Sequence, residues 1–173
     1  MKKTLIIALS CVAILFAACK KPVEPTPAPI DYAPNYVGNY IGQFTLAINS
    51  MNNQAQSGLS FPIDGIRMDI AKGSEINTIT AIVTVDDESH QTLGNTTADK
   101  ADFGTIHLVI DETHQISNPY KFNLDLLMEG TNATSDTLNI TGTFTGDGMF
   151  SFNGMENVLN EVSGTLTGKL VKQ

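Results

Sequence analysis

The sequence predicts an all-β domain, built as a single antiparallel up-and-down β-barrel of about eight strands. Apolar and polar residues alternate over most of the chain, no stretch keeps a helical period, and turn residues separate the alternating runs. The polar positions are rich in threonine, which suits the solvated face of a strand. A two-sheet β-sandwich has the same signature and stays open as the alternative.

The alternation places the strands one after another along the chain. The run Ile79, Ala81, Val83 and Val85 shows it clearly, because a single residue separates each apolar member from the next. Pro62 favours an edge position or the start of the second strand, since proline has no N–H to donate to a neighbouring strand. The expected strands cover 37–49, 60–72, 76–86, 103–113, 119–129, 136–146, 149–153 and 158–171.

The first residues of the chain have the features of a secretory leader. Two lysines begin it, and 5–18 is almost entirely apolar, which fits a signal peptide and is too short to cross a bilayer as a helix. Two alanines then precede Cys19, an arrangement that resembles the lipobox of bacterial lipoproteins, in which the cysteine bears the lipid. We therefore expect a signal peptide over 1–18 and lipidation of Cys19.

A proline-rich tether is expected to join the lipidated cysteine to the folded domain. Residues 19–36 contain repeated prolines, which favour an extended polyproline II chain, and the barrel domain is expected over 37–173. Lys20 follows the cysteine, in place of the aspartate that marks inner-membrane retention in enteric bacteria. The expected location is therefore the outer membrane, through the lipid anchor.

Charge and cysteine content exclude several kinds of protein. Removal of the leader takes away two lysines and changes the formal net charge from −8 to about −10. No basic patch exists in the domain, which argues against a nucleic-acid partner. Cys11 leaves with the leader, so no internal disulfide can form. The fold must rest on a hydrophobic core.

The unequal connections between strands predict a mouth at one end of the barrel. If each strand reverses the previous one, the long connections share one end, and the short ones share the other end with both chain termini. Long loops over one end are how barrels form a binding entrance, and we expect them to face away from the membrane. The long connections are 50–59, 87–102, 130–135 and 154–157, and the short ones are 73–75, 114–117 and 147–148.

Three segments resemble a known family. They read YVGNYIG at 36–42, ITGTFTG at 140–146 and VSGTLTGK at 162–169. They look like strands of the calycin-like (lipocalin-like) β-barrel lipoproteins of Bacteroidetes, and the resemblance extends over roughly 36–172. It implies the barrel fold rather than a particular ligand, because the chain has no tryptophan and thus lacks the Gly-x-Trp motif of lipocalins.

Acidic residues gather in and beside the longest expected loop. Several carboxylates on one segment can surround a Ca²⁺ ion, which takes six to eight oxygen ligands. The spacing matches no EF-hand, so a solvated acidic loop without a metal is the alternative. The candidates for this mouth loop or cation site are Asp86, Asp87, Glu88, Asp99 and Asp102.

Four aromatic residues are candidates for lining a ligand cavity. An eight-stranded barrel is either nearly filled by its own side chains or holds one small ligand. The same four residues could therefore form core instead, and the sequence leaves both possibilities open. They are Tyr40, Phe44, Phe122 and Phe144.

No other residues form a recognisable site. His90, His107 and His114 are expected as separate surface residues, which excludes a shared metal centre or a catalytic triad. Thr137 stands in an Asp-Thr-Leu sequence that resembles the O-glycosylation acceptor of Bacteroidetes proteins. No Gly-x-Ser-x-Gly, His-Glu-x-x-His or phosphate-binding loop occurs, so we expect neither enzymatic activity nor a cofactor.

Two functions fit these observations. The first is a membrane-anchored lipoprotein of the cell envelope that binds a small apolar or amphipathic ligand inside the barrel. The second is a non-catalytic structural or interaction module of the envelope that binds protein or glycan.

Overall fold

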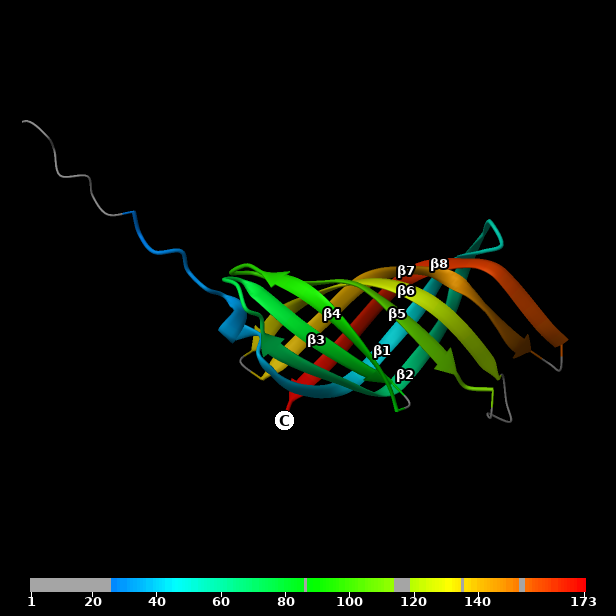
Figure 1. The fold of residues 1–173 in the computed structure, drawn as a ribbon. Coiled ribbons are helices and arrows are strands. Elements are labelled where there is room, and N and C mark those ends of the chain that lie inside the picture. Colours follow the sequence, from blue (N-terminus) through cyan, green and yellow to red (C-terminus); the bar gives the residue numbers. More distant parts are fainter. Residues whose placement is uncertain (1–25, 86, 114–118, 135, 153–154) are drawn as a thin grey trace, which may run out of the picture.

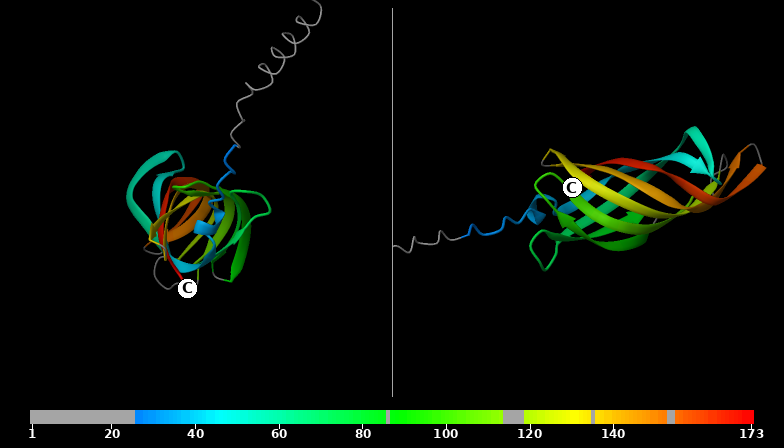
Figure 2. Two further views of the ribbon diagram at one scale, coloured as in Figure 1. Left: turned by 90° about the vertical axis from the view of Figure 1, so that its left-hand side faces the viewer. Right: turned by 90° about the horizontal axis from the view of Figure 1, so that it is seen from above.

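The computed structural model describes residues 26–85, 87–113, 119–134, 136–152 and 155–173. Eight antiparallel strands form one closed barrel in which each strand pairs with its neighbours in the sequence and β8 pairs with β1 (Figure 1; Figure 2). This confirms the predicted up-and-down barrel and excludes the sandwich. The strands are β1 (Gly38–Met51), β2 (Gln54–Lys72), β3 (Thr78–Val85), β4 (Glu88–Thr96), β5 (Ala101–Asp111), β6 (Tyr120–Thr134), β7 (Thr137–Phe152) and β8 (Met155–Lys172).

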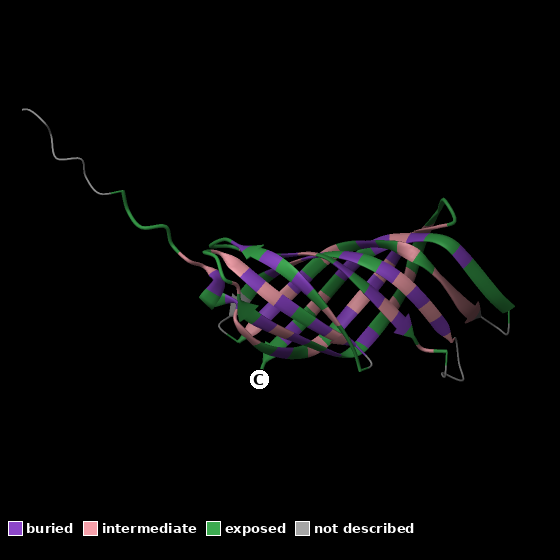
Figure 3. Cartoon of the chain, viewed as in Figure 1, coloured by how far each residue is buried: buried purple, intermediate pink, exposed green. Residues whose placement is uncertain are grey.

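Burial alternates along most of the strand length, as the period-two pattern predicts, but not along the first parts of β2 and β8 (Figure 3). On β5, Ile106, Leu108 and Ile110 point inward and are at most 3% exposed. They pair with Leu126, Leu124 and Phe122 on β6, which are also buried. The inward side chains of all strands form a single hydrophobic core.

The long acidic loop expected over 87–102 is replaced mainly by a strand. β4 runs through Glu88–Thr96 and pairs with β3 over its whole length. Its inward positions include Thr92 and Thr96, both buried, whereas its most apolar residue, Leu93, is 75% exposed. An apolar periodicity could not reveal a strand whose inward residues are mostly polar.

The predicted loop over 50–59 is also wrong. The chain reverses through Asn52 and Asn53, which have φ values of 47° and 63°. Positive φ at both central residues matches the right-handed twist of a two-residue hairpin, and asparagine tolerates it well. β2 therefore starts at Gln54, before Pro62.

The predicted turn at 147–148 lies within β7, where Asp147 pairs with Asn123 and Gly148 pairs with Phe122. The sequence thus predicts one strand too few before 103 and one too many after 146. The two errors cancel, which is why the predicted number of strands is correct.

The predicted gathering of long connections at one end is therefore wrong. The tether, the 97–100 connection between β4 and β5, and the C-terminus lie at one end of the barrel, which we call the tether end. The Asn52-Asn53 turn lies at the far end, whereas the start of β4 lies about midway along the barrel. The start of β7 also lies at the tether end, because Lys172 N donates to Asp136 O.

Part of the predicted tether packs against the barrel. A short 3₁₀ helix (Ala33–Asn35) buries Ala33 under the tether end. Asp31 forms an ion pair with Lys72 and accepts a hydrogen bond from Asn77 N at 3.1 Å. These bonds hold the pKa of the Asp31 carboxyl below its usual range, chiefly through Lys72. In the part of the chain that the structure describes, no helix is long and apolar enough to cross a membrane.

Candidate functional site

The four aromatic residues proposed to line a cavity are all buried in the barrel interior. Tyr40, Phe44, Phe122 and Phe144 are at most 2% exposed and belong to the single hydrophobic core. Their position facing the interior was predictable from strand parity. Their contacts determine whether they leave space between them.

Glycines on β8 provide the space for two of these rings. Phe44 pairs with Gly168, and Phe144 pairs with Gly164. A Cβ atom added at Gly164 would lie 2.5 Å from Cζ of Phe144, a distance that real Cβ atoms do not reach. The two rings therefore fill the volume that the glycines leave empty, which is the arrangement of a packed interior.

The tyrosines close the tether end of the interior. Tyr40 Oη donates a hydrogen bond to Tyr36 O at 3.1 Å, and Tyr36 Oη donates to Thr97 O at 3.4 Å. Both rings are 1% exposed. Their burial raises the pKa of each phenol, because it disfavours the charged form.

An aromatic cluster occupies the far half of the interior. The ring of Phe61 lies 4.9 Å from that of Tyr120 and 5.1 Å from that of Phe122, measured between centroids. Tyr120 Oη donates a hydrogen bond to Pro62 O at 3.3 Å, which joins β6 to β2 across the barrel. Side chains from opposite strands thus meet where a ligand mouth was expected.

Clefts of appreciable size lie near the far end of the barrel. One of about 370 Å³ runs between the β1–β2 turn and β8, where it is lined by Gln56 and by Met51 and Phe150, which pack against the core. A second of about 350 Å³ follows the outer faces of β6 to β8. Val158 and Leu159 of β8 line both clefts. None of the four candidate aromatic residues lines either of them.

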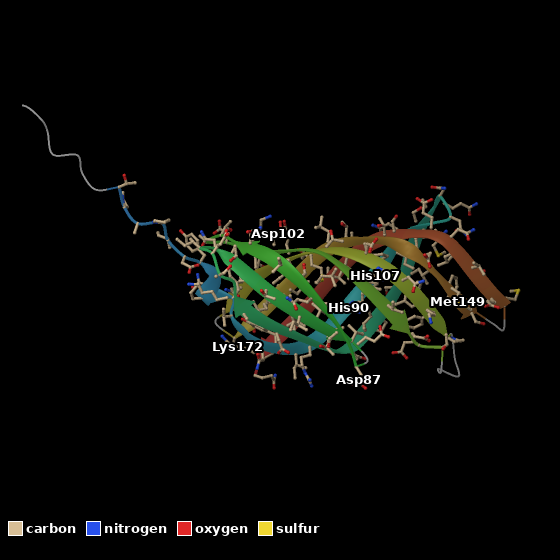
Figure 4. All side chains as sticks on the ribbon, in the orientation of Figure 1. Asp87, His90, Asp102, His107, Met149 and Lys172 are labelled. Atoms are coloured by element: carbon tan, nitrogen blue, oxygen red, sulfur yellow. The ribbon has the colours of Figure 1, made fainter. Side chains whose placement is uncertain are left out.

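The acidic candidates are divided between two separate parts of the barrel (Figure 4). Asp87 and Glu88 lie where β4 begins, about midway along the barrel, whereas Asp99 and Asp102 lie at the tether end. Asp86 lies outside the described residues. Asp102 Oδ1 accepts a hydrogen bond from Gly104 N at 2.9 Å and so supports a local turn of the backbone. The predicted single acidic mouth is therefore wrong, because β4 separates its members.

A metal site finds no support in these positions. Among the described residues, no three histidine, cysteine, aspartate or glutamate side chains are grouped so that they could hold a metal ion. Two acidic residues elsewhere on the barrel form ion pairs. Lys121 Nζ lies 2.7 Å from Asp111 Oδ2, and Lys100 forms an ion pair with Glu129.

Two histidines lie together, an arrangement that the sequence did not predict. His90 is on an inward-facing position of β4, its side chain is 25% exposed, and its ring centroid lies 6.5 Å from that of His107 on β5 (Figure 4). His90 Nε2 is buried without a hydrogen-bond partner, because Glu88 Oε2 at 3.9 Å is too distant. His107 Nδ1 lies 3.0 Å from Asp125 Oδ1. His90 is therefore not the loop residue that was expected.

The remaining predicted sites lie at or beyond the limits of the described chain. Thr137 is the partly buried first residue of β7 and pairs with Val171 of β8. Cys19 and His114 lie outside the described residues. The lipidation of Cys19 and the modification of Thr137 both stay predictions.

Comparison with known proteins gives no family for this chain. No protein-family model matches it, and no curated protein matches it either. The resemblance to calycin-like lipoproteins stays a prediction.

Proposed function

We propose that the chain is a lipid-anchored protein of the cell envelope and acts as a non-catalytic interaction module. In this proposal Cys19 holds the tether end near the outer membrane, and the far half of the barrel binds a protein partner. Two features of the barrel support it together. Side chains fill the interior, whereas apolar side chains of the far half are exposed to solvent.

The filled interior favours an interaction module over a ligand-binding barrel. The aromatic residues that would line a cavity pack against glycines and against one another. A ligand would have to displace these side chains, and such a closely packed core resists displacement. Binding on the outer surface requires no such change.

The far end presents apolar side chains to solvent. Met155 and Val158 on β8 are 69% and 63% exposed. The β7–β8 hairpin that bears them extends further from the tether than the other strands (Figure 1). Exposed apolar groups beside clefts are common where proteins meet.

The anchor can be tested by replacing the cysteine. We expect the wild-type chain to fractionate with outer membranes and a Cys19→Ala variant to be released in soluble form. The matched control is Cys11→Ala, which changes a cysteine within the leader and leaves the anchor intact. Membrane retention of Cys19→Ala would contradict a lipid anchor at this residue.

The binding face can be tested by site-specific photo-crosslinking in cells. A crosslinking amino acid at Val158 is expected to capture an envelope protein, whereas one at Ile76, which is 52% exposed at the tether end, is not. Equal capture from both positions would contradict a binding face in the far half. An apolar molecule retained by the purified protein in native mass spectrometry would support the ligand-binding function instead.

A further inference from the structure

The ladder between β4 and β5 ends after only two residue pairs. It includes Asn95 with Asp102 and the pair next to it at the tether end. Directly beyond these pairs, β5 forms a bulge at Phe103 and Gly104, where Gly104 has a φ of 67°. β6 accommodates the bulge and continues to pair with β5, but β4 does not. β4 and β5 therefore diverge toward the far end (Figure 1).

The bulge explains the divergence because it puts the two strands out of phase. If the register of the two pairs continued, Thr92 would lie opposite Thr105, and His90 opposite His107. Thr92 is buried and Thr105 is exposed, so the facing residues would point to opposite sides of the sheet. The facing backbone edges at 88–93 of β4 and 105–111 of β5 are left unpaired with each other. We call this region the seam.

A second incompletely paired edge, on β2, is blocked against further strands. β2 pairs with β3 only from Arg67 onward. Its earlier part contains Pro62 and two glycines with positive φ, Gly58 and Gly65, beside register shifts. Proline and bulges are devices that prevent a free edge from pairing with another chain.

The free edge of β8 is covered by a side chain. β8 pairs with β1 only from Val162 onward. The amide of Asn52 occupies the edge before it, since Asn52 Oδ1 accepts from Asn160 N at 2.9 Å and Nδ2 donates to Val158 O at 3.3 Å. In contrast, the described residues of the seam include no proline and no such amide cap.

A buried polar atom at the seam also indicates a missing partner. His90 Nε2 has no hydrogen-bond partner, although buried polar atoms in proteins are nearly always satisfied. The ring of His107, whose centroid lies 6.5 Å from that of His90, belongs to the strand that the bulge moves out of register. Thr92 Oγ1 donates to the bulged carbonyl oxygen of Phe103 at 2.7 Å, whereas His90 Nε2 and, in the paired part of β4, Thr96 Oγ1 are buried without a partner.

The charges around the seam select the kind of segment that could bind. Glu88 is the first residue of β4 and Asp87 precedes it, and Asp125 on β6 contacts His107. The nearby Lys121 already bonds to Asp111. A segment with positive charges complements this rim, whereas a second copy of this acidic chain would meet like charge.

We propose that the seam binds an extended, basic segment of a partner protein, which adds as a strand along the open edge of β5. This proposal rests on the interaction function proposed above and specifies its site and partner class. Main-chain hydrogen bonds to β5 would supply the binding free energy, as in other cases of strand addition. The carboxylates at the rim would favour lysine or arginine in the segment.

The test uses the full mature protein and a synthetic peptide of about ten residues, in which lysine alternates with valine, long enough to form one strand. We expect saturable binding by calorimetry, together with slower hydrogen exchange at the amides of 105–111. A Lys–Pro peptide of equal length and charge adopts polyproline II and should not bind. A Glu–Val peptide should not bind either, because its charge matches that of the rim.

Deletion of Gly104 gives a matched protein variant. The deletion brings the inward residues of β5 into phase with Thr92 and His90 while the pairing with β6 is retained, so the seam should close. We expect peptide affinity to fall by about tenfold or more, with the circular dichroism of the barrel unchanged.

Three results would overturn the proposal. They are equal binding of the Lys–Val and Lys–Pro peptides, peptide protection outside 105–111, and a stable dimer of the free protein whose contact protects this edge. The first two comparisons need only the wild-type chain, so a variant that fails to fold does not prevent the test. Capture of a partner at Val158 without strand binding at the seam would leave the interaction function standing and reject this site.

Discussion

The ring of Phe44 on β1 lies against Gly168, its register partner on β8. A Cβ atom at Gly168 would lie 2.4 Å from Cδ1 of Phe44 and 3.0 Å from the carbonyl oxygen of Gln43. The aromatic ring thus occupies the space in which any other residue at 168 would place its side chain. The small residue on one strand and the large one on its neighbour together fill the interior.

Replacing Gly168 should therefore destabilise the barrel through overpacking. We expect Gly168→Ala to lower the free energy of unfolding by about 1–3 kcal/mol, measured by chemical denaturation. Phe44→Leu in the same chain should offset part of that loss, so the double variant should be more stable than the sum of the single effects. Thr167→Ala, on the exposed neighbouring position, is the control and should change stability by about 0.5 kcal/mol or less. Additive effects would contradict direct contact between the two positions.

Substitutions in the β1–β2 turn can distinguish the contribution of the Asn52 side-chain hydrogen bonds to stability from that of the backbone conformation. Asn52 and Asn53 both have positive φ, but only Asn52 is seen to bond to the β8 edge. We expect Asn52→Gly to cost about 1–2 kcal/mol of stability, because it keeps the backbone conformation and loses the hydrogen bonds. Asn53→Gly, the matched control, should be neutral. Faster hydrogen exchange at Asn160 in Asn52→Gly alone would locate the effect.

The barrel was predictable from the sequence because most inward positions are apolar. The run from Ile79 to Val85 and the strands around Ile106 and Leu124 follow the period of two that a half-buried strand requires. β4 was not predicted because its inward residues include His90, Thr92 and Thr96. Polar residues at these positions are typical of a loop. The position of β4 depends on the hydrogen bond of Thr92 and on the pairing with β3. Neither contact produces an apolar pattern in the sequence of β4 itself.

The candidate site was less predictable because it depends on register. The aromatic residues were placed correctly in the interior, but the glycines that receive Phe44 and Phe144 lie more than a dozen residues away and become partners only through pairing. The seam arises from one bulge at Gly104, which shifts β5 against β4. A glycine between Phe103 and Thr105 was the available signal, but it does not specify which neighbouring strand loses its pairing.

The ion pair between Asp111 and Lys121 should make stability depend on pH in the acidic range. Lys121, together with Thr113, lowers the pKa of the Asp111 carboxyl to about 2. A carboxyl whose pKa is lower in the folded state stabilises the fold above its unfolded pKa, and this stabilisation is lost as the pH falls from about 4 to about 2. Asp111→Asn should therefore be less stable than wild type at neutral pH, and the difference should disappear as the pH falls below about 2.

The effect of Lys121 on the pKa of Asp111 can be measured directly. In Lys121→Met the pKa of Asp111 should rise toward its ordinary value, since the largest cause of the shift is removed. The carboxyl carbon chemical shift, followed by NMR, measures this change. An unchanged midpoint in Lys121→Met would show that the Thr113 hydrogen bonds alone hold the carboxylate.

His90 should be a site where removal of a polar group does not weaken the fold. Its Nε2 atom is buried without a partner, and such an atom costs about 1–3 kcal/mol relative to a satisfied one. We therefore expect His90→Leu to equal or exceed wild type in stability, measured by thermal denaturation. His107→Leu is the control, since His107 is 58% exposed and loses its contact with Asp125, and it should be slightly less stable than wild type. A marked loss of stability in His90→Leu would show that a bound water satisfies the nitrogen in solution, and the argument for a missing partner at the seam would lose one of its supports.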